Sequence, residues 1–296
     1  MAGGLADGGA AGRLTRMKSG RASDTALLVA RGVLLADATP ALRELLPRDC
    51  ATLTRRLVAA AAPAWWFDFA LRHAWSRALL FAAERGSVPG LVAHFAMRKC
   101  LLDRIAREAL EAGCRQIVVL GAGLDALAWR MQKHCACFEI DHPSSQEVKR
   151  RAFLADTADQ PPELIAADLL TASPAAALRA HPCFDPRVPT LLVAEGLTMY
   201  LPAERVFNLL RECAGIAAPG SRFAFTFIEA RPGQPPGFKN ARPAVNRWLR
   251  KRGEPFTWAL AREDAARFTA MHGWRLEWLS TELTIGESVA LTILPA

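Results

Sequence analysis

The sequence predicts an α/β protein with a Rossmann-like, doubly wound sheet that is mostly parallel, ends in an antiparallel hairpin and carries an N-terminal helical cap. Three observations support this fold class. Residues up to position 112 have helical spacing, short apolar runs then alternate with helical stretches, and the last two runs lie close together. Strands that alternate with helices form βαβ units, and these build a parallel sheet covered on both faces.

The N-terminal part of the chain contains helical patterns and no convincing strand pattern. Pro63 and Pro89 stand where helices can begin, and Gly113 stands where the last of them can end. We therefore expect a helical cap and substrate region over residues 23–112, preceded by a disordered basic leader over residues 1–22. The expected helices cover residues 25–36, 40–46, 64–83 and 91–112.

The remaining residues, 113–296, have the pattern of one ligand-binding α/β domain. The runs 274–279 and 288–294 are joined by a short connection that contains Gly286, which predicts an antiparallel hairpin at the sheet edge and not another crossover. The expected parallel strands cover residues 116–120, 136–140, 164–167, 190–194 and 222–228, and the expected helices cover 126–132, 146–153 and 203–217.

The chain has a formal net charge of +8, part of which is concentrated between Arg231 and Arg252. Such a stretch can attract an anionic substrate or a nucleic acid by long-range steering. No aromatic platform or nucleic-acid motif accompanies it, so we expect a solvated face and no nucleic-acid partner.

The cysteines and the hydropathy of the chain indicate its cellular compartment and its partners. The seven cysteines are scattered and odd in number, and Cys135 and Cys137 have no second pair to complete a metal site. We expect buried thiols in a reducing cytoplasm and no bound metal. The most apolar stretch, residues 57–71, contains Pro63 and Asp68 and is too short to span a bilayer, so we expect no membrane partner.

A glycine turn, Gly121-Ala122-Gly123, follows the first expected strand and precedes a helix. Glycines at such a turn let the backbone approach a ligand closely. With Ala126, the run also satisfies the Gly-x-Gly-x-x-Ala dinucleotide fingerprint. The plain alternative is a strand-to-helix turn that needs glycine for its own geometry.

Glu139 lies at the end of the second expected strand, roughly twenty residues beyond Gly121. An acidic side chain there accepts hydrogen bonds from both hydroxyls of a ribose. Asp141 is assigned the opposite strand orientation, so we expect Glu139 to face the crevice, unless a shifted strand boundary exchanges the two. Together with the glycine turn, Glu139 predicts an adenosine-type ligand. The two features do not distinguish NAD from S-adenosylmethionine.

Two further strand ends carry polar residues. Asp168-Leu169 follows the third expected strand, where an aspartate accepts from an adenine amino group and the next backbone amide addresses the ring. The same aspartate also suits a helix N-cap. Glu195-Gly196 ends the fourth expected strand at the carboxyl edge, where open α/β sheets bind ligands. A carboxylate there suits the ammonium group of a methionine moiety.

This combination resembles the leucine carboxyl methyltransferase family of S-adenosylmethionine-dependent enzymes, in its bacterial branch. The resemblance covers most of the chain from residue 23, and its two long motifs are specific. The residues that carry it are Ser23-Asp24-Thr25-Ala26, Arg98, Asp103, Arg115-Gln116, Leu120-Gly121-Ala122-Gly123-Leu124-Asp125, Arg130, Phe138-Glu139-Ile140-Asp141-His142-Pro143, Lys149, Ala167-Asp168-Leu169, Ala194-Glu195-Gly196-Leu197-Thr198-Met199-Tyr200-Leu201 and Gly253-Glu254-Pro255-Phe256.

The resemblance implies a class I methyltransferase fold in which residues 113–296 bind S-adenosyl-L-methionine. It implies that Arg98 grips the cofactor carboxylate, and it places Tyr200, the candidate catalytic residue, near the transferred methyl group, with packing as the alternative role. In the protein-phosphatase-methylating members a lysine of the N-terminal helix touches the cofactor. Only Arg31 can substitute for it here, so acceptor selection is not carried over. The implied cofactor-binding positions are Arg98, Gly121, Gly123, Glu139, Asp168, Leu169 and Glu195.

Methyl transfer from a sulfonium requires that nucleophile, methyl and sulfur be collinear. A carboxylate acceptor is already ionised at neutral pH, whereas a phenol or alcohol usually needs a base. The family pattern makes His142 structural. His73 and His94 lie in the helical half and are candidates to reach the pocket, with an ordinary surface or core position as the alternative. We therefore expect O-methylation of a small-molecule acceptor, at a carboxylate or at a phenol or hydroxyl. Candidates to line an apolar acceptor pocket, with helix packing as the alternative, are Trp65, Trp66, Phe67, Phe69 and Trp75.

Three alternatives stay open at the level of the sequence. The first is carboxyl methylation of a protein C-terminus or of a modified tRNA nucleoside, for which the basic residues over 239–252 would matter. The second is an NAD-dependent oxidoreductase, since the glycine turn and the acid of the second strand serve both cofactors. The third is a cofactor-binding protein that has lost catalysis.

Overall fold

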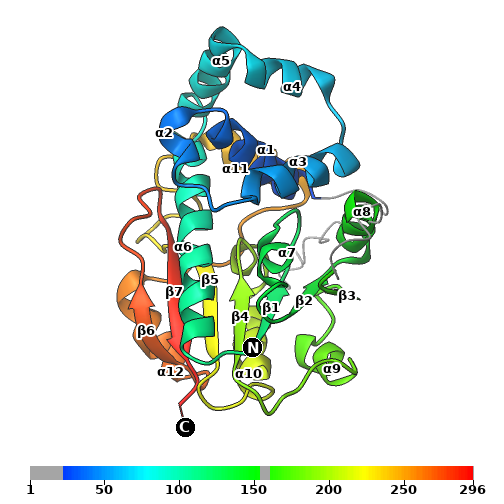
Figure 1. Cartoon of the computed structure of the whole chain (residues 1–296). Coiled ribbons are helices and arrows are strands. Elements are labelled where there is room, and N and C mark those ends of the chain that lie inside the picture. Colours follow the sequence, from blue (N-terminus) through cyan, green and yellow to red (C-terminus); the bar gives the residue numbers. More distant parts are fainter. Residues whose placement is uncertain (1–22, 154–160, 296) are drawn as a thin grey trace, which may run out of the picture.

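The computed structural model describes residues 23–153 and 161–295. A twisted sheet forms the body of the molecule, with helices on its two faces and a helical cap above it (Figure 1). The predicted disordered leader over residues 1–22 lies outside the described residues. Within them, no helix has both the length and the apolar character needed to cross a bilayer.

The sheet contains seven strands in the order β3-β2-β1-β4-β5-β7-β6, which confirms the predicted fold class. The parallel strands are β1 (Gln116–Leu120), β2 (Ala136–Asp141), β3 (Glu163–Ala166), β4 (Thr190–Ala194) and β5 (Arg222–Ile228). The closing hairpin consists of β6 (Arg275–Leu279) and β7 (Glu287–Ile293), and β7 also pairs antiparallel with β5. Because the chain returns from β3 to β4, the strand order reverses between β1 and β4, where open α/β sheets bind ligands.

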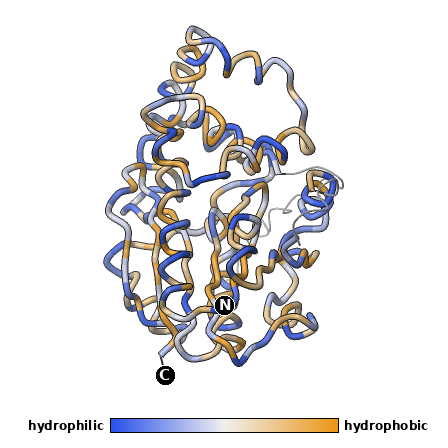
Figure 2. The backbone as a smooth tube through the Cα atoms, in the orientation of Figure 1, coloured by the Kyte–Doolittle hydropathy of each residue, from blue (hydrophilic) through white to orange (hydrophobic). Residues whose placement is uncertain are grey.

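Apolar residues on both sides of the strands build the two core layers. Ile117 and Val119 of β1 pack with α6 (Leu91–Glu111) and α7 (Leu127–Met131) on one face. Val118 and Leu120 pack with the other layer, as expected for a central strand covered on both faces. That layer contains α9 (Pro174–Arg179), α10 (Ala203–Ala214) and α12 (Ala265–Ala270). Hydrophobic segments accordingly concentrate inside the body (Figure 2).

The cap is built from α1 (Asp24–Asp37), α2 (Pro40–Arg43), α3 (Cys50–Ala61), α4 (Trp65–Arg72) and α5 (Ala74–Arg85). The Ser23 hydroxyl caps α1 by accepting from the backbone N–H of Ala26 at 3.1 Å. The helix predicted over 64–83 is instead two helices, since His73 has extended backbone with φ −104° and ψ 135°. α4 and α5 form a hairpin at the far end of the molecule (Figure 1).

The other helices connect these layers. α8 (Pro143–Phe153) follows β2, and its Val148 and Phe153 belong to the same core cluster as α1 and α3. α11 (Pro243–Arg252) follows β5 and contributes Val245 to a small cluster around Phe95. The sequence patterns did not predict α3, α9, α11 or α12.

Candidate functional site

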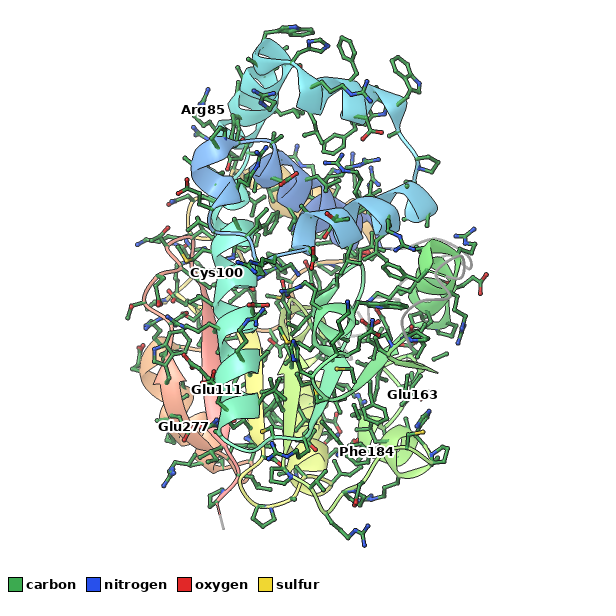
Figure 3. The ribbon with its side chains drawn as sticks, in the orientation of Figure 1. Arg85, Cys100, Glu111, Glu163, Phe184 and Glu277 are labelled. Carbon is green, nitrogen blue, oxygen red and sulfur yellow. The ribbon has the colours of Figure 1, made fainter. Side chains whose placement is uncertain are left out.

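A cavity of about 1410 Å³ opens at the carboxyl ends of the central strands, beneath the cap. Its walls come from the turn after β1, from the ends of β2 and β4, from the segment after β3, and from α1, α6 and α11. Ligand sites typically occupy roughly 300–1,000 Å³. The cavity therefore has room for a cofactor and a second molecule together. Figure 3 shows α6, with Cys100 along the helix and Glu111 at its lower end.

The predicted glycine turn lines the cavity and needs glycine for its conformation. Gly121 and Gly123 have positive φ values of 65° and 47°. A Cβ atom on Gly121 would lie 2.8 Å from Leu197 Cδ1, so the turn packs tightly under the loop that follows β4. The backbone N–H of Gly121 donates to Ile140 O at 2.8 Å, which ties the turn to β2.

The carboxylate of β2 that reaches the cavity is Asp141, and this corrects the placement predicted for Glu139. Asp141 Oδ2 accepts from the backbone N–H of Gly123 at 2.5 Å, and Oδ1 accepts from that of His142 at 2.6 Å. Glu139 is fully buried, does not line the cavity, and pairs with Lys149 Nζ at 2.5 Å. Residues two apart on a strand point to the same face, so the opposite orientation assumed for Asp141 was wrong. β2 continues to Asp141, so Glu139 lies two residues before the carboxyl end of the strand and does not reach the cavity.

Arg98 and Lys99 converge on Glu195 at the end of β4. Arg98 Nε donates to Glu195 Oε1 at 2.9 Å, and Lys99 Nζ donates to Oε2 at 2.9 Å. Lys99 also contacts Asp125 Oδ1 at 2.7 Å. All four side chains line the cavity, which brings predicted Arg98 and Glu195 together and adds the unpredicted Lys99. Gly196 has φ 60°, and a Cβ there would lie 3.9 Å from the Arg98 guanidinium.

Glu287, at the start of β7, holds the other side of the Arg98 guanidinium. Arg98 Nη1 lies 2.9 Å from each Glu287 carboxylate oxygen, and His94 Nε2 lies 2.6 Å from Oε2. Burial by itself would raise the pKa of Glu287, but Arg98 and His94 outweigh it and lower that pKa to about 2. Nothing local in the sequence signals this residue, because only the pairing of β7 with β5 brings it to the cavity.

We expect the Glu287→Gln variant to lose stability in a pH-dependent way. The folded-state pKa of about 2 lies below the ordinary 4.5, so the ionised carboxylate contributes about 3 kcal/mol above pH 4.5, and this is lost as pH falls toward 2. Urea unfolding of both proteins between pH 7 and pH 2.5 measures the difference in free energy of unfolding. That difference should shrink below pH 4.5, and a difference that stays constant down to pH 2.5 would contradict the ion pair.

Asp168 and Leu169 also line the cavity, in the segment after β3. Asp168 Oδ1 accepts from the backbone N–H of Leu170 at 3.0 Å, so the aspartate fixes its own turn. An ionised carboxylate has two oxygens and about four acceptor positions, which leaves acceptor capacity for a ligand. The turn-forming role and the predicted binding role are therefore compatible.

Two sequence motifs far apart in the chain meet at the cavity wall. Glu254 Oε2 accepts from the backbone N–H of Thr25 at 3.0 Å and also from its hydroxyl, and Arg252 pairs with Asp24. Tyr200 lines the cavity beside them, with its ring centroid 5.3 Å from that of Phe256. Burial and the Glu254 carboxylate raise the pKa of Tyr200, so its phenol stays protonated at neutral pH.

Several candidate residues of the cap do not reach the cavity. His73 lies in the hairpin, His94 is buried behind Glu287, and Arg31 contacts the Trp66 ring instead. The aromatic residues proposed for the acceptor pocket do not line it either, because α4 presents most of them outward. These residues are Trp65, Trp66, Phe67, Phe69 and Trp75.

Comparison with known proteins gives a consistent set of matches. A family model described as leucine carboxyl methyltransferase matches residues 30–214. A Mycobacterium avium (strain 104) protein named "Putative S-adenosyl-L-methionine-dependent methyltransferase" is 35% identical over 210 residues, which are 66% of this chain and 65% of that protein. A protein of the same name from Mycobacteroides abscessus is 32% identical over 221 residues, 68% of each chain. The chain thus matches 65% of the length of the first of these relatives.

A solved structure shares the fold. The crystal structure described as a putative methyltransferase from Thermobifida fusca YX aligns with a TM-score of 0.55 at 19% sequence identity. The alignment covers 94% of this chain and 96% of that one. At this identity the likeness concerns the fold, including the cap as well as the sheet.

Proposed function

The chain belongs to the leucine carboxyl methyltransferase family, and on this premise we propose that it transfers a methyl group from S-adenosyl-L-methionine to an oxygen of a small-molecule acceptor. The family match confirms the resemblance drawn from residues 98–149, and the sheet is that of a class I methyltransferase. The observation that carries the proposal is the cavity at the strand-order reversal, which brings together the glycine turn, Asp141 and the Arg98–Glu195 pair.

The lining residues suit the parts of the cofactor in turn. The turn at Gly121 and Gly123 lines the cavity without side chains of its own, and Asp141 beside it offers a carboxylate for the ribose hydroxyls. Asp168 and Leu169, which also line the cavity, are available for the adenine. Arg98 and Glu195 then remain for the carboxylate and ammonium of the methionine end, where opposite charges already meet.

The acceptor is expected to bind against the ring of Tyr200 and its aromatic neighbours. When bound, S-adenosylmethionine supplies an electrophilic methyl group on its sulfonium. Tyr200 comes after β4 in the chain, and its ring contacts that of Phe256. The centroid of the Phe256 ring lies 5.3 Å from that of Phe238. All three rings line the cavity and form an aromatic wall. Such a wall positions a flat or apolar acceptor, so that its oxygen is oriented for in-line attack.

The titratable groups support a carboxylate acceptor. Tyr200 has a raised pKa and is a donor at neutral pH, so it does not serve as a base. His142 is the one histidine among the described lining residues, and it follows Asp141 at the ribose end. Arg242 lines the cavity with no ion-pair partner among the described residues, and its charge attracts an anion. An acceptor that is already ionised needs no base.

The proposal is tested by following the methyl group. The full chain is incubated with methyl-tritiated S-adenosylmethionine and matched pairs of aromatic and aliphatic carboxylic acids, phenols and alcohols. A methyl ester releases volatile methanol in mild alkali, whereas an ether does not. We expect base-labile label from the acids and none with the Asp141→Ala variant. Base-stable label would assign a hydroxyl acceptor, label in tRNA or protein would favour the macromolecular alternative, and no transfer to any class would refute small-molecule O-methylation.

A further inference from the structure

The α4–α5 hairpin exposes large apolar side chains that nothing in the described chain covers. Trp65 is 82% exposed and Trp75 is 61% exposed. Five of the seven large hydrophobic side chains that are exposed in the described residues belong to this hairpin, so they form a local feature and not a general property of the surface. The aromatic hairpin surface, as we call it, consists of Trp65, Trp66, Phe69, Trp75 and Leu79.

The inner side of the hairpin is anchored in the cap. Phe67 and Leu71 are buried on the inner side of α4, which anchors the helix in the cap core. On the outer side, the Phe69 ring lies 6.2 Å from Trp75 and 4.5 Å from His73 between centroids, so the two helices present one continuous aromatic face. The hairpin projects from the end of the molecule, and Arg85 marks where α5 returns to the body (Figures 1 and 3).

A positively charged hollow lies beside the aromatic hairpin surface. Its volume is about 380 Å³, and its lining includes four arginines against two aspartates. Arg55 lies 3.6 Å from Asp37 and 3.7 Å from Asp68, so both acids are already engaged. Arg72, on the same helix as Trp65, has no ion-pair partner among the described residues. The charged residues of the hollow are Asp37, Arg43, Arg55, Asp68, Arg72 and Arg77.

The aromatic hairpin surface is also connected to residues that line the large cavity. The guanidinium of Arg31 lies 5.3 Å from the Trp66 ring centroid. Leu28 lies one helical turn before Arg31 on α1, is 42% exposed and lines the cavity. At the other end of the hairpin, α5 is followed directly by Gly86, Ser87 and Val88, which line the cavity too.

We propose that the α4–α5 hairpin docks on an anionic lipid bilayer. Its tryptophans enter the interfacial region, where their amphipathic rings are favoured, and Arg72 with the neighbouring arginines meets lipid phosphates. An exposed aromatic tip at the end of the molecule fits a deformable bilayer surface. A second copy of the chain fits less well. The chain has a net charge of +8, and two copies that met through this surface would bring their two positively charged hollows together. The proposal replaces the expectation of no membrane partner, goes beyond methyl transfer and does not depend on it.

Sedimentation with sucrose-loaded vesicles tests the docking with the full chain. We expect binding to vesicles of phosphatidylglycerol and phosphatidylcholine and little binding to pure phosphatidylcholine. The double variant Trp65→Ser with Trp75→Ser should bind about tenfold more weakly, and Arg72→Glu should also lose about tenfold. Met271→Ser, at another side chain that is 72% exposed, is the matched control and should bind as the wild type does. The thermal shift with S-adenosylhomocysteine should be unchanged in all variants, which shows that the fold and cavity are intact.

Three outcomes would overturn the docking. Absence of sedimentation with the anionic vesicles is one, and equal binding to neutral vesicles is another. The third is an equal loss in Met271→Ser and in the tryptophan variant. A concentration-dependent dimer in size-exclusion chromatography that the tryptophan variant abolishes would assign the surface to a second copy instead. None of these measurements requires catalysis, so failure of the docking and failure of the methyl-transfer proposal are distinguishable.

Discussion

Replacement of Asp141 by alanine should lower the affinity for S-adenosylhomocysteine by about 100-fold, which is the loss expected when two charge-assisted hydrogen bonds disappear. Asp141 lines the cavity beside the glycine turn, whereas Glu139 is buried against Lys149. The same replacement at Glu139 should therefore leave the affinity of the folded protein nearly unchanged. Calorimetric titration of S-adenosylhomocysteine into each variant compares the two carboxylates directly.

Replacement of Glu139 by alanine should lower the free energy of unfolding. Lys149 is 1% exposed, and its ammonium would lose its carboxylate partner inside the protein. Removing one member of a buried ion pair costs about 3–5 kcal/mol. Urea unfolding of Glu139→Ala against the wild type measures this loss, and Asp141→Asn serves as the control that keeps side-chain size at the cavity. A large loss of affinity in Glu139→Ala with none in Asp141→Ala would reverse the assignment.

Replacement of Arg98 by alanine should abolish measurable S-adenosylhomocysteine binding and also destabilise the protein by about 3–5 kcal/mol. Arg98 uses Nε for Glu195 and Nη1 for Glu287, so its loss weakens the pairing of two buried carboxylates at once. Lysine at this position has one ammonium and no planar fork. Arg98→Lys should therefore recover part of the stability and little of the affinity.

A double-mutant cycle separates the two roles of Arg98. If Glu287 acts through Arg98, then Glu287→Gln should cost less stability in the Arg98→Ala background than alone, because the unpaired carboxylate is removed at the same time. Affinity should stay low in the double variant, since the guanidinium is still missing. Additive stability losses in urea unfolding, or restored S-adenosylhomocysteine binding, would show that the two side chains act independently.

The strands that are buried on both faces could be predicted from the sequence. The runs at β1, β4 and β5 are apolar on both faces and bounded by turn residues, so their bounds were predicted correctly. The break at His73 was not predicted because neither glycine nor proline marks it. α11 was also missed, since its sequence is strongly basic and buries Leu249 almost alone.

The site could be predicted where it follows strand ends, and not where it depends on tertiary pairing. The glycine turn, Arg98, Asp168, Leu169, Glu195 and Tyr200 all lie at the cavity, while their roles stay predictions. Glu139 does not line the cavity, because β2 is one residue longer than expected and its carboxyl end lies at Asp141. Glu287 is brought in by β7, whose position next to β5 no local spacing encodes. The tryptophans of α4 were misplaced because an apolar helical pattern does not say which face meets the body.

Calorimetric titration of the wild-type chain with S-adenosylhomocysteine and, in parallel, with NAD tests the assignment of the cavity most directly. The glycine turn and an acid at the end of β2 suit both ligands, but the Arg98–Glu195 pair suits only the amino-acid end of S-adenosylmethionine. We predict saturable binding of one S-adenosylhomocysteine per chain and no heat with NAD. Saturable binding of NAD without binding of S-adenosylhomocysteine would contradict the methyltransferase assignment.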